Sequence, residues 1–322
     1  MLDDLTKYFL LIFLALLVAL IGFTKQVDQD WILFTNGSDI NQLLSIKSNI
    51  VVIDYSADGT EKTEFSYSDI SQLKSTGKKV FAYVNLGIAE NWRFYWKSLN
   101  KSIILSPLEG WKGEYYVKYW YREWYDMMRN YLNRVKKSGF DGVMFDWTNV
   151  YKHETLQKIT GKSEKDLKIA MFELINTLTR DFNNFQFALV NGEEILNDYP
   201  ALTDRVKYVV VESLFFDKLK LNTLSDAFQQ RIKILINVQK MGVTVLSVEY
   251  IDNGNPFDKE NVQRINQYIE LAKKYNFLYY IARYDMKLTF PNVPRISLRN
   301  SADDFKNLAE YIIPNHLSSL FR

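Results

Sequence analysis

Residues 139–147 read GFDGVMFDW, a short apolar run that starts after a glycine and ends in an aspartate and a tryptophan. The residues before it, 123–138, have a helical pattern, and Gly139 is well placed to end that helix. We therefore predict a helix followed by a buried strand, with Asp146 where the strand ends. The repetition of this unit along the chain decides the fold.

Seven other apolar runs have the length and composition of buried strands. They are residues 50–54, 79–86, 115–120, 186–191, 207–212, 243–250 and 277–283. Near-continuous apolar strands that alternate with helices indicate a parallel sheet covered on both faces. We predict an α/β fold, a single (β/α)8 TIM-type barrel, with residues 31–35 as an extra strand or a piece of the rim. The alternative is an open doubly wound sheet, but no glycine-rich phosphate loop follows any strand.

The N-terminal segment is apolar. Residues 8–23 are uninterrupted apolar or small residues, which is short for a spanning helix and typical of a signal peptide. We expect residues 1–25 to be a signal peptide or a membrane anchor and residues 26–322 to form the barrel. The protein is then secreted, or it is held at the extracellular face of the membrane through residues 5–23.

The composition excludes several classes of site. The 322 residues contain no cysteine and only two histidines, His153 and His316. Disulfides, thiolate–zinc sites and cysteine nucleophiles are therefore excluded, and histidine-rich metal sites are nearly so. We expect no metal and no cofactor. The net charge of +2 lacks the basic excess of a polyanion-binding protein, so nucleic acid is not an expected partner.

The ends of the predicted strands carry the chemistry, because barrel enzymes place function at the carboxyl ends of their strands. Most of these ends have a carboxylate on or just after them, and none ends in lysine or histidine. Schiff-base chemistry needs a lysine at a strand end, and a binuclear metal centre needs several histidines or a modified lysine, so that pattern favours neither. Paired carboxylates suit glycoside hydrolysis, which needs one protonated acid and one ionised group. The candidates at or near strand ends are Asp54, Asn85, Glu90, Asp146, Asn191, Glu212, Tyr250 and Arg283.

Aromatic residues cluster beside these ends. Five of the seven tryptophans fall between Trp92 and Trp124, and flat apolar sugar faces stack on such rings. We add the residues of the aromatic loop, together with the residue after Asp146, as candidate substrate contacts: Trp92, Arg93, Tyr95, Trp96 and Trp147. A buried ion pair of Asp54, with Arg283 as its partner, is the alternative to a substrate contact at that position.

In their order, these motifs resemble the endo-α-1,4-polygalactosaminidase-like glycoside hydrolases, family 114. The matching segments are VVIDY, GKKVFAYVNLGIAENWRFYW, YYVKYW, GFDGVMFDW, VNGEEIL, VVVESLFFD, VEYID and YIARYD, between about residues 31 and 285. The resemblance implies a barrel that hydrolyses an α-1,4-linked galactosamine-containing polysaccharide. It places the catalytic acids on Asp146 and Glu212.

Two positions depart from the family pattern, since Ile88 and Asn149 stand where members often carry acids. These departures keep open a non-catalytic carbohydrate-binding barrel at the cell surface. A membrane-tethered barrel that serves a protein partner is a further alternative.

For the mechanism we expect retention, with Asp146 as nucleophile and Glu212 as acid/base. The two strands that end in Asp146 and Glu212 are separated by one strand, so their ends lie roughly 10 Å apart at the backbone. Inward side chains can close that gap to the roughly 5–5.5 Å of retaining enzymes, whereas about 6.5–9.5 Å would indicate inversion.

Overall fold

The computed structural model describes residues 7, 24–35, 37, 39–286 and 294–297. Most of the predicted signal or anchor segment, residues 1–25, lies outside the described residues, and so does His316. Within the described part of the chain, no helix is long and apolar enough to cross a bilayer.

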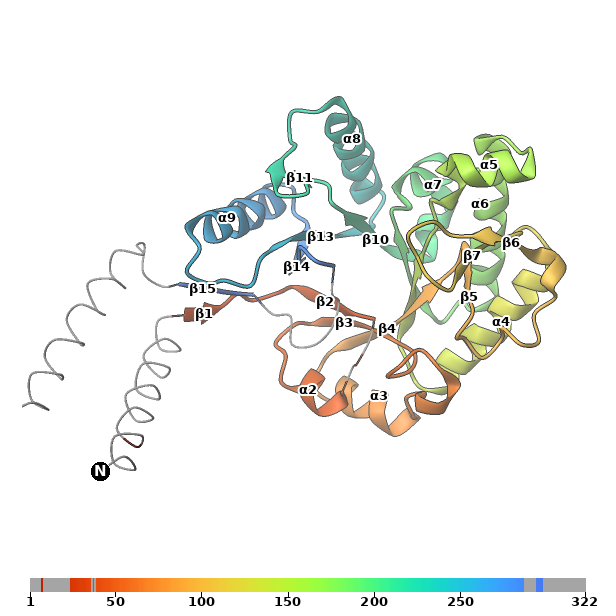
Figure 1. The fold of residues 1–322 in the computed structure, drawn as a ribbon, viewed down its shortest axis with the longest axis horizontal. Coiled ribbons are helices and arrows are strands. Elements are labelled where there is room, and N and C mark those ends of the chain that lie inside the picture. The colour runs from red at the N-terminus through yellow and green to blue at the C-terminus, as the bar shows by residue number, and fades with distance from the viewer. Residues whose placement is uncertain (1–6, 8–23, 36, 38, 287–293, 298–322) are drawn as a thin grey trace, which may run out of the picture.

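Eight parallel strands form the central sheet, and they follow one another in space as they do in sequence. The sheet curls until its two edge strands contact each other, where the backbone N–H of Asp30 donates to the carbonyl of Tyr279 at 3.2 Å. The result is a nearly closed α/β barrel (Figure 1). Its strands are β2 (Trp31–Phe34), β3 (Ile50–Asp54), β4 (Lys79–Asn85), β8 (Gly142–Asp146), β9 (Gln186–Val190), β10 (Val206–Glu212), β13 (Thr244–Asp252) and β14 (Leu278–Arg283).

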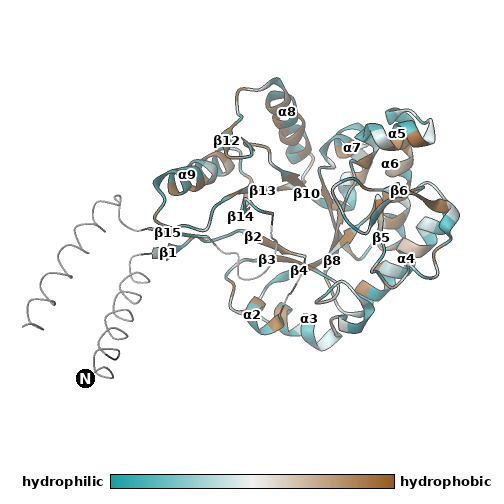
Figure 2. Ribbon diagram, viewed as in Figure 1, coloured by the Kyte–Doolittle hydropathy of each residue, from teal (hydrophilic) through white to brown (hydrophobic). Residues whose placement is uncertain are grey.

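Helices surround the sheet and turn their apolar faces toward it (Figure 2). Several begin where the sequence supplies a side-chain cap: Ser66 and Asp69 form a capping box before one helix, and Ser225 and Asp258 cap two others. The helices are α2 (Ile40–Leu44), α3 (Tyr67–Lys74), α4 (Arg122–Lys137), α5 (Glu154–Thr160), α6 (Glu164–Asp181), α7 (Glu193–Asp198), α8 (Asp226–Lys240) and α9 (Lys259–Lys274).

Short elements complete the fold. The 3-10 turns are η1 (Glu61–Thr63), η2 (Lys101–Ile103), η3 (Val150–Lys152) and η4 (Pro200–Asp204). Two small antiparallel ladders pair β1 (Thr24–Gln26) with β15 (Arg295–Ser297) and β11 (Phe216–Asp217) with β12 (Lys220–Leu221).

The prediction is wrong for one of the barrel strands. Residues 115–120 were expected in the barrel, but β7 (Glu114–Val117) is the central strand of a separate antiparallel sheet. Its neighbours are β5 (Ile88–Glu90) and β6 (Ile104–Pro107), so the insertion after β4 folds as a small sheet beside the barrel (Figure 1).

The place of that strand in the barrel is taken by β2, which the sequence analysis assigned to an extra strand or the rim. All four residues of β2 are buried, and the indole N–H of Trp31 donates to the carbonyls of Ser247 and Leu278. A strand buried on both faces is continuously apolar, as β2 is. The segment of β7 is not, because it begins with Glu114 and is followed by Lys118.

Candidate active site

The carboxyl ends of the barrel strands and the β5–β7 insertion enclose a cavity of about 590 Å³. That volume suits a small ligand. Most of the predicted site residues line the cavity: Asp54, Asn85, Glu90, Trp92, Arg93, Asp146, Trp147, Asn191, Glu212 and Tyr250. His153 and Asn149 line it as well, while Ile88 is buried in β5 outside it.

Asp146 ends β8 and is held by two neutral donors. The hydroxyl of Tyr83, on the adjacent strand β4, donates to one carboxylate oxygen, and the backbone N–H of Trp147 donates to the other at 2.5 Å. Burial and the charge of Glu212 raise the pKa of Asp146 to about 7, against the lowering effect of both hydrogen bonds. The two carboxylates are therefore close enough for the charge of one to oppose ionisation of the other.

Glu212 ends β10 and is also held by neutral donors. The Tyr250 hydroxyl donates to one carboxylate oxygen at 2.6 Å, and the Asn191 amide donates to the other at 2.9 Å. The Asn191 carbonyl in turn accepts from the Glu212 backbone N–H at 3.2 Å and from Arg231 at 3.0 Å. These two bonds fix which end of the Asn191 amide faces Glu212.

The backbone at three neighbouring strand ends adopts a conformation that is rare for residues other than glycine. Trp147, Asn191 and Ser213 follow β8, β9 and β10, and their φ angles are 57°, 50° and 47°. Such residues cost on the order of 1–3 kcal/mol each and concentrate at functional sites. The turns after these three strands are thus strained next to Asp146 and Glu212.

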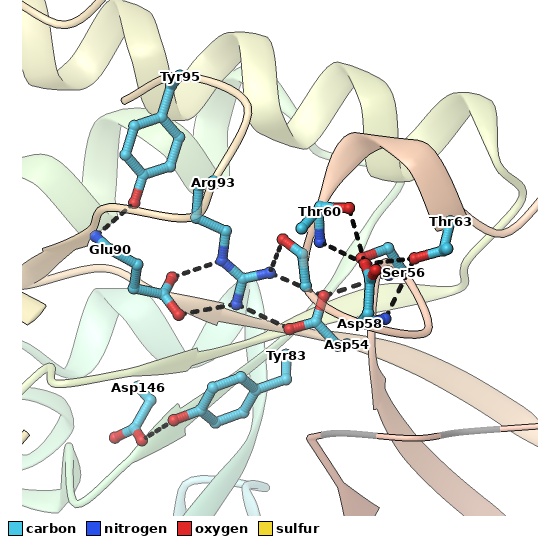
Figure 3. A network of polar contacts seen from close by, with 11 residues as sticks. Asp54, Ser56, Asp58, Thr60, Thr63, Tyr83, Glu90, Arg93, Tyr95 and Asp146 are labelled. Carbon is cyan, nitrogen blue, oxygen red and sulfur yellow. Dashed lines mark hydrogen bonds and ion pairs between the residues drawn. The ribbon is translucent and has the colours of Figure 1, made fainter. Parts of the chain in front are cut away.

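A second buried cluster lies around Arg93, on the β5 side of the cavity. The guanidinium donates to both carboxylate oxygens of Glu90, at 2.7 and 2.9 Å, and contacts both oxygens of Asp54, at 2.8 and 2.7 Å (Figure 3). All three side chains are buried. The expected pairing of Asp54 with Arg283 is wrong, because Arg283 lies 3.8 Å from Asp252 instead.

Three predicted substrate contacts do not line the cavity. Tyr95 is buried beneath the aromatic loop, and its hydroxyl accepts from the backbone N–H of Glu90 at 3.0 Å. Trp96 packs against Tyr115, with the Lys101 ammonium over its ring. Arg283 is the third. The rings of Tyr95 and Trp96 pack against other aromatic rings of the protein and do not face the cavity.

The sequence analysis missed several lining residues, among them Tyr83, Trp111 and Glu114. Tyr83 carried a signal: it lies two residues before Asn85 on one strand, and side chains two apart share a face. Trp111 and Glu114 precede the segment that was wrongly assigned to the barrel, so the sequence analysis could not predict that they line the cavity. Trp111 meets Trp147 edge to face, with ring centroids 6.1 Å apart.

Within the described residues, no group of three or more histidine, aspartate and glutamate side chains is arranged to hold a metal ion. The arrangement consists instead of two neighbouring carboxylates, neutral hydrogen-bond donors around them, and exposed tryptophans at the cavity mouth. Such a site can protonate one atom of a bound ligand while a carboxylate attacks another.

Comparison with known proteins gives a consistent picture. The family model for glycoside-hydrolase family GH114 matches residues 22–301. An uncharacterised protein of Thermotoga maritima is 34% identical over 272 residues, which is 82% of this chain and 83% of that protein. An uncharacterised protein of Methanocaldococcus jannaschii is 30% identical over 281 residues, covering 84% of this chain and 80% of the relative.

Two solved structures share the fold. Aspergillus fumigatus Ega3, in complex with galactosamine, has a TM-score of 0.62 at 18% identity, covering 85% of this chain and 96% of that one. The glycoside hydrolase domain of PelA from Pseudomonas aeruginosa has a TM-score of 0.62 at 13% identity, covering 84% and 98%.

Proposed function

Because the chain belongs to glycoside hydrolase family GH114, we propose that it hydrolyses O-glycosidic bonds in an α-1,4-linked galactosamine-containing polysaccharide, with Asp146 and Glu212 as the catalytic pair. One observation carries the assignment of the pair. Asp146 and Glu212 end two strands of the same barrel, line the same cavity, and interact strongly enough that Glu212 raises the pKa of Asp146.

The state of the pair suits this chemistry. Burial and the charge of Glu212 raise the pKa of Asp146 to about 7, so a proton is retained on Asp146 in part of the molecules near neutral pH. Glycoside hydrolysis requires that state, with one carboxylic acid and one carboxylate on either side of the scissile bond. The groups that donate to the two carboxyl groups carry no charge.

In the proposed mechanism Asp146 is the nucleophile and Glu212 the acid/base, so the proton retained by the raised pKa of Asp146 has to pass to Glu212 before the attack. Glu212 protonates the leaving oxygen while an Asp146 oxygen attacks the anomeric carbon, which breaks the glycosidic bond and forms a glycosyl ester. Glu212, now ionised, takes a proton from water as the water attacks the same carbon. The ester breaks, Asp146 is released as a carboxylate, and the anomeric configuration is retained.

The charge of the cavity supports an amino-sugar substrate. Its lining contains the acids Asp54, Asp58, Glu90, Glu114, Asp146 and Glu212, whereas Arg93 is already bound by Asp54 and Glu90. An ammonium-bearing polymer is attracted to such a lining. The galactosamine bound in the structure of Ega3, which shares this fold, is of the same class.

The decisive test incubates the protein with de-N-acetylated and N-acetylated α-1,4-galactosamine polymers and measures new reducing ends. We expect reducing ends from the de-N-acetylated polymer, and NMR of the first product should show the α-anomer. A β-anomer as first product would replace retention by inversion. Polymer binding without reducing ends would favour the non-catalytic carbohydrate-binding barrel.

We also propose that residues 1–25 export the protein, either as a cleaved signal or as an anchor, and that residues 26–322 are the mature barrel. Cell fractionation and N-terminal sequencing of the mature protein test this. A cytoplasmic protein with an intact N-terminus would contradict it.

A further inference from the structure

Glu114 is a buried carboxyl group that the catalytic proposal does not use. In the antiparallel ladder of β5 and β7, Glu114 lies directly opposite Glu90, so both side chains stand on the same face of the small sheet. Both line the cavity. Glu90 binds Arg93 through both oxygens, whereas one Glu114 oxygen, Oε2, is buried with no hydrogen-bond partner among the described residues.

Asn85, which lines the same cavity, holds a second buried acceptor without a partner among the described residues. It ends β4, opposite Asp146 in the parallel register, and is 3% exposed. Burial raises the pKa of Glu90, and a hydrogen bond from Asn85 opposes that rise. The Oδ1 of Asn85 is buried without a partner in the described structure. A buried acceptor left without a donor costs about 1–3 kcal/mol. Two such atoms in one cavity call for a donor that a ligand brings.

The surrounding charges indicate which kind of donor fits. The charged groups that act on Glu114 are Glu90 and Asp146, which disfavour its ionised form, and Arg93, which favours it. Arg93 is fully engaged by its two acids. A neutral hydroxyl supplies one proton and leaves the excess negative charge uncompensated, whereas an ammonium group supplies three donors and the missing positive charge.

We propose that Glu114 and Asn85 form the recognition site for the protonated amino group of a substrate sugar, and that Glu114 makes the enzyme select free amines over N-acetylated ones. This inference rests on the proposed function and adds to it the residues that discriminate. An acetamido group carries no charge and a single N–H, so it cannot stabilise the ionised form of Glu114. Glu114 is thus a specificity residue, distinct from the catalytic pair.

The protonation of Glu114 provides a second signature of the same contact. Burial, together with Glu90 and Asp146, raises the pKa of Glu114 to about 8, so the empty site holds its proton at neutral pH. An ammonium bound against Glu114 favours the carboxylate. Binding of the amino sugar should therefore release a proton, whereas binding of the N-acetylated sugar should not.

The test compares wild type with Glu114→Gln, which keeps the shape of the side chain and removes its ability to ionise. The matched control is Glu109→Gln, because Glu109 is an exposed acid on the same insertion. On galactosamine oligosaccharides, Glu114→Gln should lower kcat/KM at least tenfold, while kcat/KM on N-acetylated oligosaccharides stays unchanged or rises. The control should change neither value.

Titration calorimetry in buffers of different ionisation enthalpy gives a readout that does not depend on turnover. Wild type should release close to one proton on binding a galactosamine trisaccharide at pH 7, and Glu114→Gln should release markedly less. Equal losses on both substrates, or unchanged proton release in the variant, overturn the inference and leave the proposed function standing. A wild-type protein that neither binds nor cleaves galactosamine oligosaccharides overturns both.

Discussion

Two clusters of buried carboxylates face the same cavity, and they are neutralised in different ways. Asp54 and Glu90 share the guanidinium of Arg93, which contacts four carboxylate oxygens at 2.7–2.9 Å. The donors to the carboxylates of Asp146 and Glu212 in the described structure are neutral: tyrosine hydroxyls, an amide and a backbone N–H. No ion pair to Asp146 or to Glu212 is found within the described residues.

The difference separates a structural role from a chemical one. A guanidinium that grips a carboxylate through two N–H groups requires the ionised form and fixes its geometry. The Arg93 cluster therefore joins the aromatic loop to β3. A neutral donor binds either the acid or its anion, so Asp146 and Glu212 can exchange protonation states during a reaction.

The largest expected effect comes from neutralising the second cluster. Asp146→Asn and Glu212→Gln should each lower kcat on a galactosamine polymer by about 10³-fold or more, since positioned acid–base groups alone contribute about 10²–10⁴-fold. Thermal unfolding should show no loss of stability, because each substitution removes a charge that burial disfavours. Near-wild-type activity in either variant would remove the pair from the mechanism.

The same variants separate the two roles when azide is supplied with an activated substrate. Azide that replaces a lost acid/base group attacks the glycosyl ester, and on an α-retaining enzyme the product is the α-glycosyl azide. We expect that product from Glu212→Gln. Its appearance from Asp146→Asn would exchange the roles of the two residues.

Breaking the first cluster should unfold the protein rather than merely inactivate it. Arg93→Met leaves Asp54 and Glu90 buried without a counterion, and loss of one partner of a buried pair costs about 3–5 kcal/mol. Urea unfolding followed by circular dichroism measures the loss. The matched control is Arg122→Met, which removes an exposed arginine paired with Asp126 and should leave the midpoint unchanged. A small effect at Arg93 would make its cluster dispensable.

The sequence predicted the second cluster better than the first for a physical reason. Asp146 and Glu212 each end a continuous apolar run, so strand periodicity alone places them at the mouth of a barrel. The partner of Asp54 is set by how the insertion after β4 folds back, 39 residues along the chain, and no local pattern encodes that contact.

The same limit explains the error in the fold. Both β2 and residues 115–120 have the composition of strands, and only the tertiary arrangement decides which of them joins the barrel. The insertion was therefore misread, and Trp111 and Glu114 were missed with it.

A smaller effect is expected from altering one neutral donor. Tyr83→Phe removes the hydroxyl that donates to Asp146. A hydrogen bond to a charged group contributes about 1.5–3 kcal/mol, so kcat should fall about 10- to 100-fold. The bond lowers the pKa of Asp146, so its loss should move the acidic limb of the pH–rate profile to higher pH.

The control is Tyr119→Phe, because the Tyr119 hydroxyl donates to the Leu167 carbonyl outside the cavity. That variant should keep the wild-type pH profile. A profile for Tyr83→Phe that coincides with wild type would show that Tyr83 does not tune the pair.

The smallest expected effect is on the pH dependence of the free energy of unfolding, and it concerns Glu249, a buried acid outside both clusters. Glu249 on β13 is 1% exposed and accepts from the backbone N–H of Phe215 at 2.7 Å, and burial raises its pKa to about 8. A carboxyl group whose pKa is raised on folding stabilises the protein at low pH and loses that contribution as pH rises through the raised value. The free energy of unfolding should therefore fall between about pH 4.5 and pH 8. One such group gives a slope of at most about 1.4 kcal/mol per pH unit. Asp146 and Glu114, whose pKa values are also raised, add to the slope with the same sign.

Glu249→Gln should flatten the curve of unfolding free energy against pH, as measured by urea unfolding at a series of pH values. An equally steep curve in the variant would assign the pH dependence to the acids of the cavity alone.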